Sequence, residues 1–323
     1  MSILAGIDIG GTKCAVSVGE DVGTTIQVHG QRRFSTPTAP HDVIEQACRE
    51  LDCLRVEHGV RSLDAIGVSC GGPLNSAAGI VLSPPNLPAW DHIDVVTPLC
   101  AYFGVPVGLQ NDANAGALAE WTWGAGRGCR TMIFLTFGTG MGAGLILDGR
   151  LYEGANGLAG EIGHMRLEHD GPVGYGKPGS FEGFCSGGGI ARLARTMAEA
   201  QLRAGQAVLY CPTLADLLSV TAHTVGEAAR QGDALALEVW RIVGHQLGRG
   251  LAVLVDLLNP ERIVIGSIYG RQQAILEPLT MRALQQEALP QALAVCEIVP
   301  AALGEQIGNV ASLAVALHTI ERR

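Results

Sequence analysis

Two glycine-rich stretches organise this sequence: Asp8-Ile9-Gly10-Gly11-Thr12-Lys13 near the start and Gly138-Thr139-Gly140-Met141-Gly142-Ala143-Gly144 near the middle. Apolar residues flank each stretch on both sides, so each is predicted to form a turn between two β-strands. Glycine permits positive φ and close backbone approach, and successive N–H groups in such a turn form a nest for an anion. The hydroxyls of Thr12 and Thr139 add donors. The pair of turns favours a nucleotide whose phosphates are held from two domains.

Neither turn matches the phosphate loops that lead into a helix. A Walker loop ends in Gly-Lys-Ser/Thr at a helix start, and the dinucleotide motif Gly-x-Gly-x-x-Gly also opens a helix. Taken alone, each turn is compatible with an ordinary glycine hairpin that has no ligand. Two such turns in one chain, one of them carrying Asp8, favour phosphate binding.

The composition indicates a compact globular protein. With 323 residues and 33.7 kDa the chain exceeds the usual single core, so we expect two domains. Nine cysteines without a Cys-x-x-Cys pair favour a reducing cytoplasm over a disulfide framework. We see no secretion signal and no apolar run of membrane-spanning length, and therefore expect no membrane partner. A formal charge of −9 and only two lysines, Lys13 and Lys177, argue against a nucleic-acid partner.

Apolar periodicity along the chain predicts an α/β protein, because strand-like and helical stretches alternate in the first hundred or so residues. Asn111 and Asp112 both precede a helix, and either is a candidate for its N-cap. The glycine-rich stretch 149–189 is too long for an ordinary connection and predicts a binding loop. The last helix is expected to pack on the first domain. Helices are predicted at 43–58, 113–121, 191–205, 213–231, 235–258 and 307–320, strands at 65–69 and 106–110, and a strand with a glycine turn at 262–267.

Four motifs resemble, in order and spacing, those of the ROK family of sugar kinases, which includes glucokinases and N-acetylhexosamine kinases. They are Asp8 to Lys13, Asn111-Asp112-Ala113-Asn114-Ala115, Gly138 to Gly144 and Gly160-Glu161-Ile162-Gly163-His164, and the likeness covers nearly the whole chain. The resemblance implies the actin-like, ribonuclease-H-like ATPase fold, in which two α/β domains flank a cleft. We expect residues 1–117 plus 307–323 to form the N-terminal domain and residues 118–306 the larger C-terminal domain.

The resemblance assigns Asp112 as the general base that accepts the proton of a sugar hydroxyl, by default the 6-hydroxyl, as that oxygen attacks the γ-phosphorus of ATP. The structural alternative for Asp112 is the helix N-cap. The implied sugar-binding set is Gly72, Asn86, Asn111, Asp112, Glu161, His164 and Glu182. A turn residue is the alternative for Asn86, and a satisfied surface histidine for His164.

The same resemblance implies ATP and Mg²⁺ as cofactors. Asp8 is expected to face Mg²⁺ through water, because that ion keeps much of its hydration shell. Adenosine contacts are assigned to Gly266 and Ser267, after a predicted strand. The implied ATP-binding set is Asp8, Gly10, Gly11, Thr12, Lys13, Gly138, Thr139, Gly140, Gly142, Gly266 and Ser267.

The sequence departs from the family at the zinc site, where the usual pattern is a histidine followed by Cys-x-Cys-Gly-x-x-Gly-Cys-x-Glu. The three cysteine positions hold Val173, Tyr175 and Ser180, while Gly176, Gly179 and Glu182 stay in register. One histidine cannot hold a structural zinc, which takes four ligands, so we expect no zinc. We expect aromatic packing to order this loop instead, through Tyr175, Phe181 and Phe184.

The leading functional prediction is an ATP-dependent kinase of a hexose or amino sugar, with the particular sugar left open. The alternative is a sugar-sensing regulatory protein without turnover. A DNA-binding repressor of the same family is disfavoured, because the phosphate turn begins at Asp8 and leaves no room for a helix-turn-helix before it. Family resemblance also favours a homodimer or a larger homo-oligomer.

Overall fold

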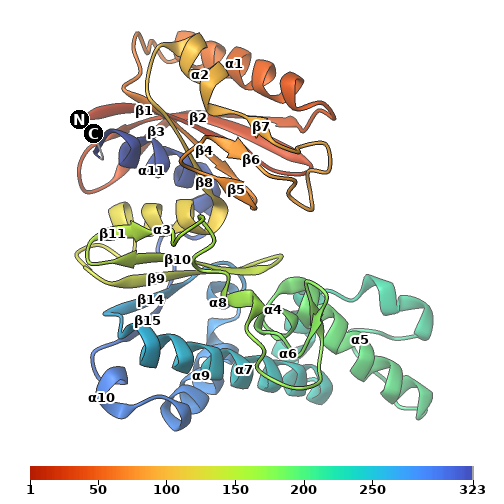
Figure 1. Ribbon diagram of the computed structural model, residues 1–323. Helices are drawn as coiled ribbons and strands as arrows, with labels where there is room; N and C mark the ends of the chain where they lie inside the picture. The colour runs from red at the N-terminus through yellow and green to blue at the C-terminus, as the bar shows by residue number, and fades with distance from the viewer. Residues whose placement is uncertain (322–323) are drawn as a thin grey trace. The chain divides into compact units, whose positions relative to one another are not determined.

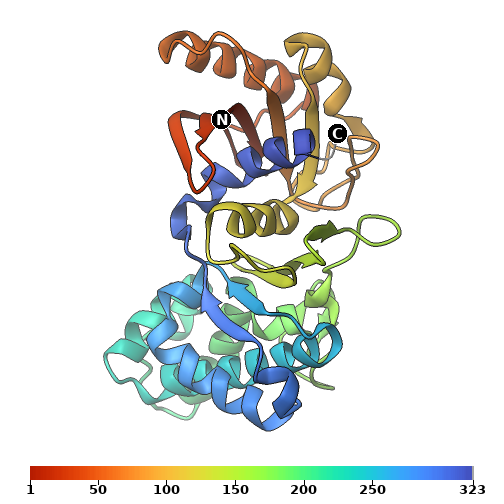
Figure 2. The ribbon, with the colours of Figure 1, turned by 90° about the vertical axis from the view of Figure 1, so that its left-hand side faces the viewer.

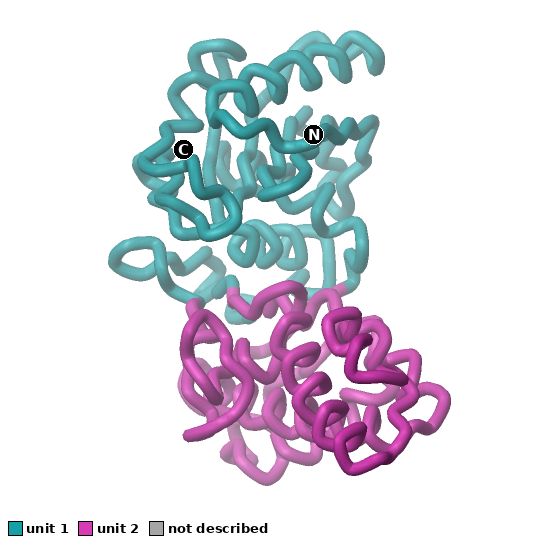
Figure 3. The backbone as a smooth tube through the Cα atoms, turned by 90° about the vertical axis from the view of Figure 1, so that its right-hand side faces the viewer, with its two compact units in different colours: residues 1–134, 144–160, 302–323 teal, residues 135–143, 161–301 magenta. Residues whose placement is uncertain are grey.

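The computed structural model describes residues 1–321 and divides the chain into two compact units. Unit 1 consists of Met1–Phe134, Gly144–Gly160 and the chain from Ala302 onward, and unit 2 of Leu135–Ala143 and Glu161–Ala301 (Figure 3). Unit 1 therefore includes residues 118–134, 144–160 and 302–306, all of which the predicted domain boundary had assigned to the second domain. The domain limits given above stay a prediction.

The sheet of unit 1 has five strands in the order β3-β2-β1-β4-β8. The strands β1, β2 and β3 pair antiparallel, whereas β1, β4 and β8 pair parallel. Buried residues of these strands pack with those of the helices α1 and α2 into one hydrophobic core. The predicted strand-turn-strand around Gly10 is confirmed. The bounds are β1 (Ser2–Ile9), β2 (Lys13–Asp21), β3 (Ile26–Ser35), α1 (Pro40–Glu57), β4 (Ala65–Cys70), α2 (Val96–Phe103) and β8 (Val107–Asn111).

The helix α11 (Ile307–Glu321) packs against β1, β4 and β8 although it ends the chain (Figures 1 and 2). Gly6, Gly67 and Gly108 are partners in register across these three strands and form a glycine row. A Cβ on Gly67 would overlap the backbone of α11 at Ser312, and one on Gly108 would overlap the Thr319 hydroxyl. The helix backbone can lie on the sheet only because this row has no side chains. The expected packing of the last helix on the N-terminal part is confirmed.

The helix α3 (Asp112–Trp123) also packs against α11 and carries a buried carboxylate. Glu120 is fully buried and accepts hydrogen bonds from the backbone N–H groups of Ala125 at 2.7 Å, Ala302 at 3.2 Å and Leu303 at 2.9 Å. Glu120 thereby fixes the segment that leads back into α11. Unit 1 is completed by a small sheet, β5 (Leu74–Asn75), β6 (Ile80–Val81) and β7 (Ile93–Asp94), and by the 3₁₀ turn η3 (Gly304–Gln306).

A second five-stranded sheet has the order β11-β10-β9-β14-β15. The second predicted strand-turn-strand is confirmed as β9 and β10, and α7 packs along α9 in unit 2. The strand and helix bounds are β9 (Met132–Phe137), β10 (Met141–Leu147), β11 (Arg150–Tyr152), β12 (Val173–Gly174), β13 (Lys177–Pro178), α4 (Phe181–Phe184), α5 (Gly187–Arg203), α6 (Ala222–Arg230), α7 (Ala234–Leu258), β14 (Arg262–Ile265), α8 (Ile268–Arg271), α9 (Gln273–Glu287), α10 (Pro290–Leu293) and β15 (Glu297–Pro300). Two 3₁₀ turns, η1 (Ile162–His164) and η2 (Leu214–Ser219), belong to unit 2.

The predicted single helix at 213–231 is wrong, because the chain forms η2 and α6 there. Thr221 separates the two: its hydroxyl accepts from the N–H of Thr224, and the Thr224 hydroxyl accepts from the N–H of Thr221. This reciprocal cap ends one helical segment and starts another, although the pattern of apolar residues on which the prediction relied continues through it. Among residues 1–321, no helix combines the length and the apolar character needed to cross a membrane.

Replacement of Gly67 by alanine is expected to lower the free energy of unfolding by about 2–3 kcal/mol, because the new Cβ pushes α11 off the sheet. Urea unfolding measures this. The matched control is Gly308→Ala in α11 itself, where a Cβ meets no atom within 4 Å and a gain of up to about 1 kcal/mol is expected. Equal stability of the two variants would contradict the role of the glycine row.

Candidate active site

A row of polar residues follows the glycine row at the carboxyl ends of β1, β4 and β8. Asp8 is in register with Ser69, and Ser69 with Gln110. Each lies two residues after a glycine of the row, and therefore on the same face of the sheet. The chain leaves β4 at Gly71 and β8 at Asn111, at this same edge. Because ligand sites of α/β proteins lie outside the carboxyl ends of strands, the polar row marks the candidate site of unit 1.

The first glycine turn is fixed from both sides. The N–H of Gly10 donates to the carbonyl of Lys13 at 3.2 Å, and the hydroxyl of Thr36 donates to the carbonyl of Gly10 at 2.6 Å. A Cβ on Gly11 would lie 2.5 Å from the carbonyl oxygen of Asn86. The predicted sugar residue Asn86 therefore packs directly on the predicted phosphate turn. Nothing in the sequence pointed to Thr36, which lies outside every motif.

The N-cap of α3 is Asn111, whose Oδ1 accepts a hydrogen bond from the N–H of Asn114 at 2.7 Å. The alternative in which Asp112 caps the helix is therefore wrong. Asp112 is the first helical residue and is accessible to solvent, and its carboxylate accepts from the N–H of Ala113 at 2.9 Å. Despite this access, the protein around Asp112 desolvates its carboxyl and raises the pKa, against the lowering effect of the Ala113 N–H.

Asp8 is partly buried at the end of β1. Desolvation raises the pKa of its carboxyl to about 7, the Asp112 carboxylate adds to the rise, and Arg33 opposes it. A carboxyl held half-protonated near neutral pH is a group that a nearby cation would ionise. Its electrostatic environment therefore fits a metal ion carried by phosphates.

A buried hydrogen-bond network lies behind the cap of α3. Gln110 accepts from the side-chain amide of Asn114 at 3.1 Å and donates to the carboxylate of Glu153 at 2.9 Å. Gln110 is 4% exposed and Asn114 is 1% exposed. No sequence pattern indicated this network, because its members belong to separate stretches that only the fold brings together.

The second glycine turn, between β9 and β10, is built into unit 2. The N–H of Gly138 donates to the carbonyl of Gly140 at 3.1 Å, and the N–H of Gly187 donates to the carbonyl of Gly138 at 2.8 Å. The N–H of Gly142 donates to the hydroxyl of Thr136 at 3.0 Å. The bond from Gly187 joins the turn to the first residue of α5, and the other two hold the turn between its own strands.

Three predicted sugar-binding residues gather beside this turn. Glu182 in α4 accepts from the N–H of Met141 in the turn at 3.2 Å. Glu161 precedes η1, and its carboxylate lies 4.0 Å from the Nε2 of His164 at the end of η1. A Cβ on Gly163 would overlap the carbonyl of Met141, so η1 also rests on the turn. Glu161, His164 and Glu182 therefore form one constellation in unit 2.

A cavity of about 660 Å³ opens next to the second turn in unit 2. Gly138 and Thr139 of the turn line it, together with Gly187 and Ala191 of α5 and the predicted nucleoside residue Ser267. Ser267 has φ of 56°, a strained conformation for a residue other than glycine that is often found at functional sites.

Two arginines, Arg195 and Arg271, also line this cavity. The hydroxyl of Ser267 accepts from Arg271 at 2.8 Å, while Arg195 donates to the carbonyls of Leu218 at 3.1 Å and Val220 at 2.9 Å. Sequence analysis missed Arg195 and Arg271. The one local sequence feature that could have indicated this cavity is the run of glycines after Ser186, where α5 begins.

The loop that carries the zinc pattern does not fit a zinc ion. Val173 has no donor atom, and Ser180 is fully buried, with its hydroxyl serving as the N-cap of α4. Tyr175 is 66% exposed. Within residues 1–321 no group of three or more His, Cys, Asp or Glu side chains is placed to hold a metal ion. The absence of zinc stays a prediction.

Packing and hydrogen bonds within unit 2 order this loop. The rings of Phe181 and Phe184 are buried, and they lie where a Cβ on Gly250 of α7 or on Gly171 would be. Glu168 pairs with Arg249 of α7. The expectation that aromatic residues order the loop is therefore supported for the two phenylalanines, whereas Tyr175 is mostly exposed and makes one edge-on ring contact, with His164.

Comparison with known proteins places this geometry in a family. The sequence matches the profile of the ROK family over residues 4–318. The chain belongs to the ROK family. It is 31% identical over 314 residues to a glucokinase of Streptomyces coelicolor, with 96% of each chain covered.

Two further ROK proteins show what the family contains. The crystal structure of a ROK glucokinase from Streptomyces griseus in complex with glucose and AMPPNP is similar with a TM-score of 0.78 and 28% identity, covering 98% of this chain and 99% of that one. The DNA-binding transcriptional repressor Mlc of Escherichia coli is 32% identical over 238 residues, which cover 73% of this chain and 56% of Mlc. The crystal structure of the Streptomyces griseus glucokinase confirms the α/β fold that the resemblance implied.

Replacement of Asp8 by asparagine is expected to stabilise this ROK protein near pH 8 by about 1–3 kcal/mol. The unfolded chain ionises Asp8 at its ordinary pKa of 3.8, whereas the folded protein holds the proton up to about pH 7. Native stability therefore falls as pH rises through this window, and an uncharged side chain avoids the loss. Thermal unfolding at pH 8 and pH 4 measures the gain, which should vanish at pH 4. A gain of equal size at both pH values would refute the electrostatic cause.

Proposed function

We propose that this ROK protein transfers the γ-phosphoryl group of ATP to a hydroxyl, by default the 6-hydroxyl, of a hexose or amino sugar. The observation that carries the proposal is the position of Asp112. Asp112 lies at the carboxyl edge of the sheet of unit 1 and is accessible to solvent, while Asn111 caps the helix. The similarity to glucokinases over nearly the full chain supports the same reaction class.

Asp112 is the general base of this mechanism. Its carboxylate accepts the proton of the sugar hydroxyl as that oxygen approaches the γ-phosphorus, and the raised pKa brings its basicity nearer to the working pH. Phosphoryl transfer otherwise depends on positioning and on stabilisation of charge. The rigid strand-to-helix junction at Asn111 supplies the positioning.

Sugar recognition requires groups that match hydroxyls as both donors and acceptors. In unit 1, the backbone at Gly72 and the side chains of Asn86 and Asn111 serve this purpose. The side chain of Asn86 lies beside the segment that carries Gly72, because a Cβ on the neighbouring Gly71 would be 3.5 Å from the Oδ1 of Asn86. In unit 2, the constellation beside the second glycine turn offers two carboxylates and an imidazole.

The two glycine turns bind the phosphates of ATP in this proposal, and the cavity beside Ser267 takes the nucleoside. Asp8 would hold Mg²⁺ through water, which fits the elevated pKa of its carboxyl. When bound, Mg²⁺ would neutralise charge on the transferred phosphoryl group. A cytoplasmic location, supported by nine unpaired cysteines, and a homo-oligomeric state belong to the same proposal.

The alternative is a sugar-sensing protein without turnover, and the similarity to the repressor Mlc supports this alternative. The discriminating experiment is ADP release from Mg-ATP across hexoses, amino sugars and their N-acetyl derivatives. Sugar-dependent ADP release supports the kinase. Sugar binding by calorimetry without ADP release would support the sensor.

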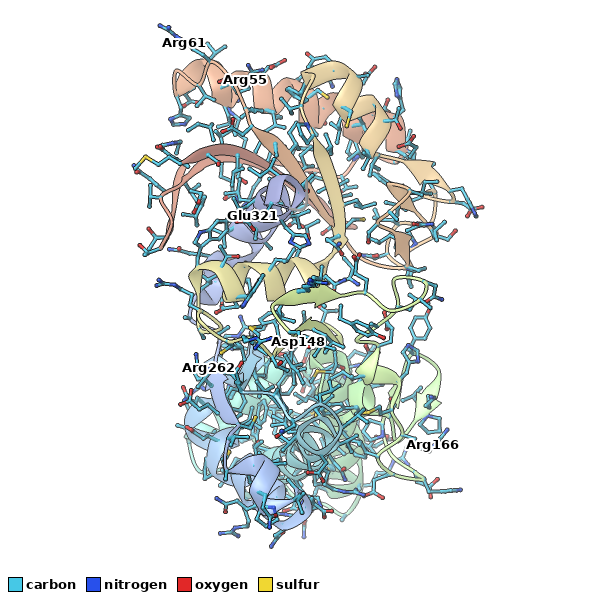
Figure 4. The ribbon with its side chains drawn as sticks, turned by 60° about the vertical axis from the view of Figure 1, so that its left-hand side comes forward. Arg55, Arg61, Asp148, Arg166, Arg262 and Glu321 are labelled. Carbon is cyan, nitrogen blue, oxygen red and sulfur yellow. The ribbon has the colours of Figure 1, made fainter. Side chains whose placement is uncertain are left out.

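Replacement of Asp112 by asparagine is expected to lower kcat by about 10²–10⁴-fold, because the variant keeps the shape of the site but loses the base. The same ADP-release assay measures it. The control is Asp148→Asn, which changes an exposed carboxylate at the β10–β11 turn (Figure 4) and should leave kcat unchanged. Retention of full activity by the Asp112 variant would remove the proposed base.

Replacement of Ala191 by phenylalanine is expected to raise the KM for ATP by about tenfold, because the ring fills part of the cavity. The KM for the sugar should stay within about twofold, since the cavity is assigned to the nucleoside alone. Steady-state kinetics with each substrate varied separately measure both constants. Ala204→Phe, at the exposed end of α5, is the matched control. An increase in the sugar KM alone would contradict the assignment.

A further inference from the structure

A two-residue hairpin lies at the centre of the loop that departs from the zinc pattern. The strands β12 and β13 pair Gly174 with Lys177, and the turn consists of Tyr175 and Gly176. Both turn residues have positive φ, 46° and 76°, as a tight hairpin turn of the primed type requires. The turn therefore sets the direction in which the side chains of Tyr175 and Lys177 leave the hairpin.

Those side chains reach the predicted sugar residue His164. The ammonium group of Lys177 donates a hydrogen bond of 2.6 Å to the carbonyl of His164, in a partly buried position. The ring of Tyr175 meets the imidazole of His164 edge-on, with centroids 4.8 Å apart and planes at 75°. One contact fixes the backbone of His164 and the other its ring.

The base of the hairpin is held firmly enough to transmit this restraint. The buried hydroxyl of Ser180 lies 3.4 Å from the carbonyl of Gly174, to which it donates, and accepts from the N–H of Gly183 at 3.1 Å. A Cβ on Gly174 would lie 2.5 Å from the same N–H, so the hairpin sits directly on α4. Arg166, which Figure 4 labels, donates to the carbonyl of Pro178 at 2.8 Å.

We propose that Lys177 is a positioning residue of the sugar site, which together with Tyr175 holds His164 in place without a metal ion. This inference rests on the proposed function for the role of His164. The three cysteines of the family's zinc pattern are replaced here by Val173, Tyr175 and Ser180, and the cation that contacts His164 is an ammonium group of the chain. Hydrogen bonds from a charged donor are the stronger kind, so one lysine suffices to restrain a short 3₁₀ turn.

Steady-state kinetics of three variants test the inference. Lys177→Met should raise the sugar KM by about tenfold and leave kcat and the ATP KM within about twofold, because only the geometry of His164 changes. Lys177→Arg keeps a charged donor and should recover most of the loss. Arg166→Met removes a bond to the same hairpin that does not reach His164, and its sugar KM should match the wild type. Thermal unfolding checks that all three are folded.

An unchanged sugar KM in Lys177→Met would overturn the inference. A parallel rise in Arg166→Met would do so too, since that result means general loosening of the loop. Stoichiometric zinc in the purified protein is a third contrary result.

Amide hydrogen exchange over residues 161–167 provides a readout that needs no turnover. Exchange there should be faster in Lys177→Met and unchanged in Arg166→Met. If no sugar supports ADP release by the wild type, the proposed function fails, whereas the exchange comparison still decides whether Lys177 restrains His164. Unchanged exchange in Lys177→Met would then refute the restraint itself.

Discussion

Direct contact between the backbone of α11 and the sheet is the constraint on which unit 1 depends. The glycine row makes this contact possible, and it places the last helix of the chain on three parallel strands whose carboxyl ends carry the polar row. Asp8, Ser69 and Gln110 each follow a glycine of the row by two residues. The part of the sheet on which the α11 backbone lies is therefore followed directly by the polar row. Packing and chemistry therefore share one face of the sheet, separated by a single step along each strand.

In each unit, some of the residues expected to bind sugar pack onto the backbone of a glycine turn. The carbonyl of Asn86 lies against Gly11 in unit 1, while η1 and Glu182 rest on Met141 in unit 2. A side chain on either turn would therefore displace a sugar residue as well as obstruct an anion. The glycines in these motifs serve two requirements at once, close approach by a ligand and close approach by the neighbouring segment.

The sequence predicted those parts of the site that depend on local patterns. Both strand-turn-strand units, the helix after Asp112 and the final helix follow from apolar periodicity and glycine, and the structure has them. The choice between Asn111 and Asp112 as cap needed side-chain geometry, because both residue types cap helices well. The break at Thr221 escaped notice because a reciprocal threonine cap leaves the pattern of apolar residues almost intact. The nucleoside cavity and the Gln110 network join residues far apart in the chain, and no local pattern records such contacts.

The scarcity of lysine described at the outset has a practical consequence for labelling chemistry. This protein has two lysines, Lys13 in unit 1 and Lys177 in unit 2, and therefore two side-chain amines. Lys13 is exposed, whereas the amine of Lys177 is engaged with a carbonyl. An amine-selective reagent therefore meets one free and one occupied group, apart from the α-amino terminus, and the ratio of their acylation rates reports on the hairpin in solution.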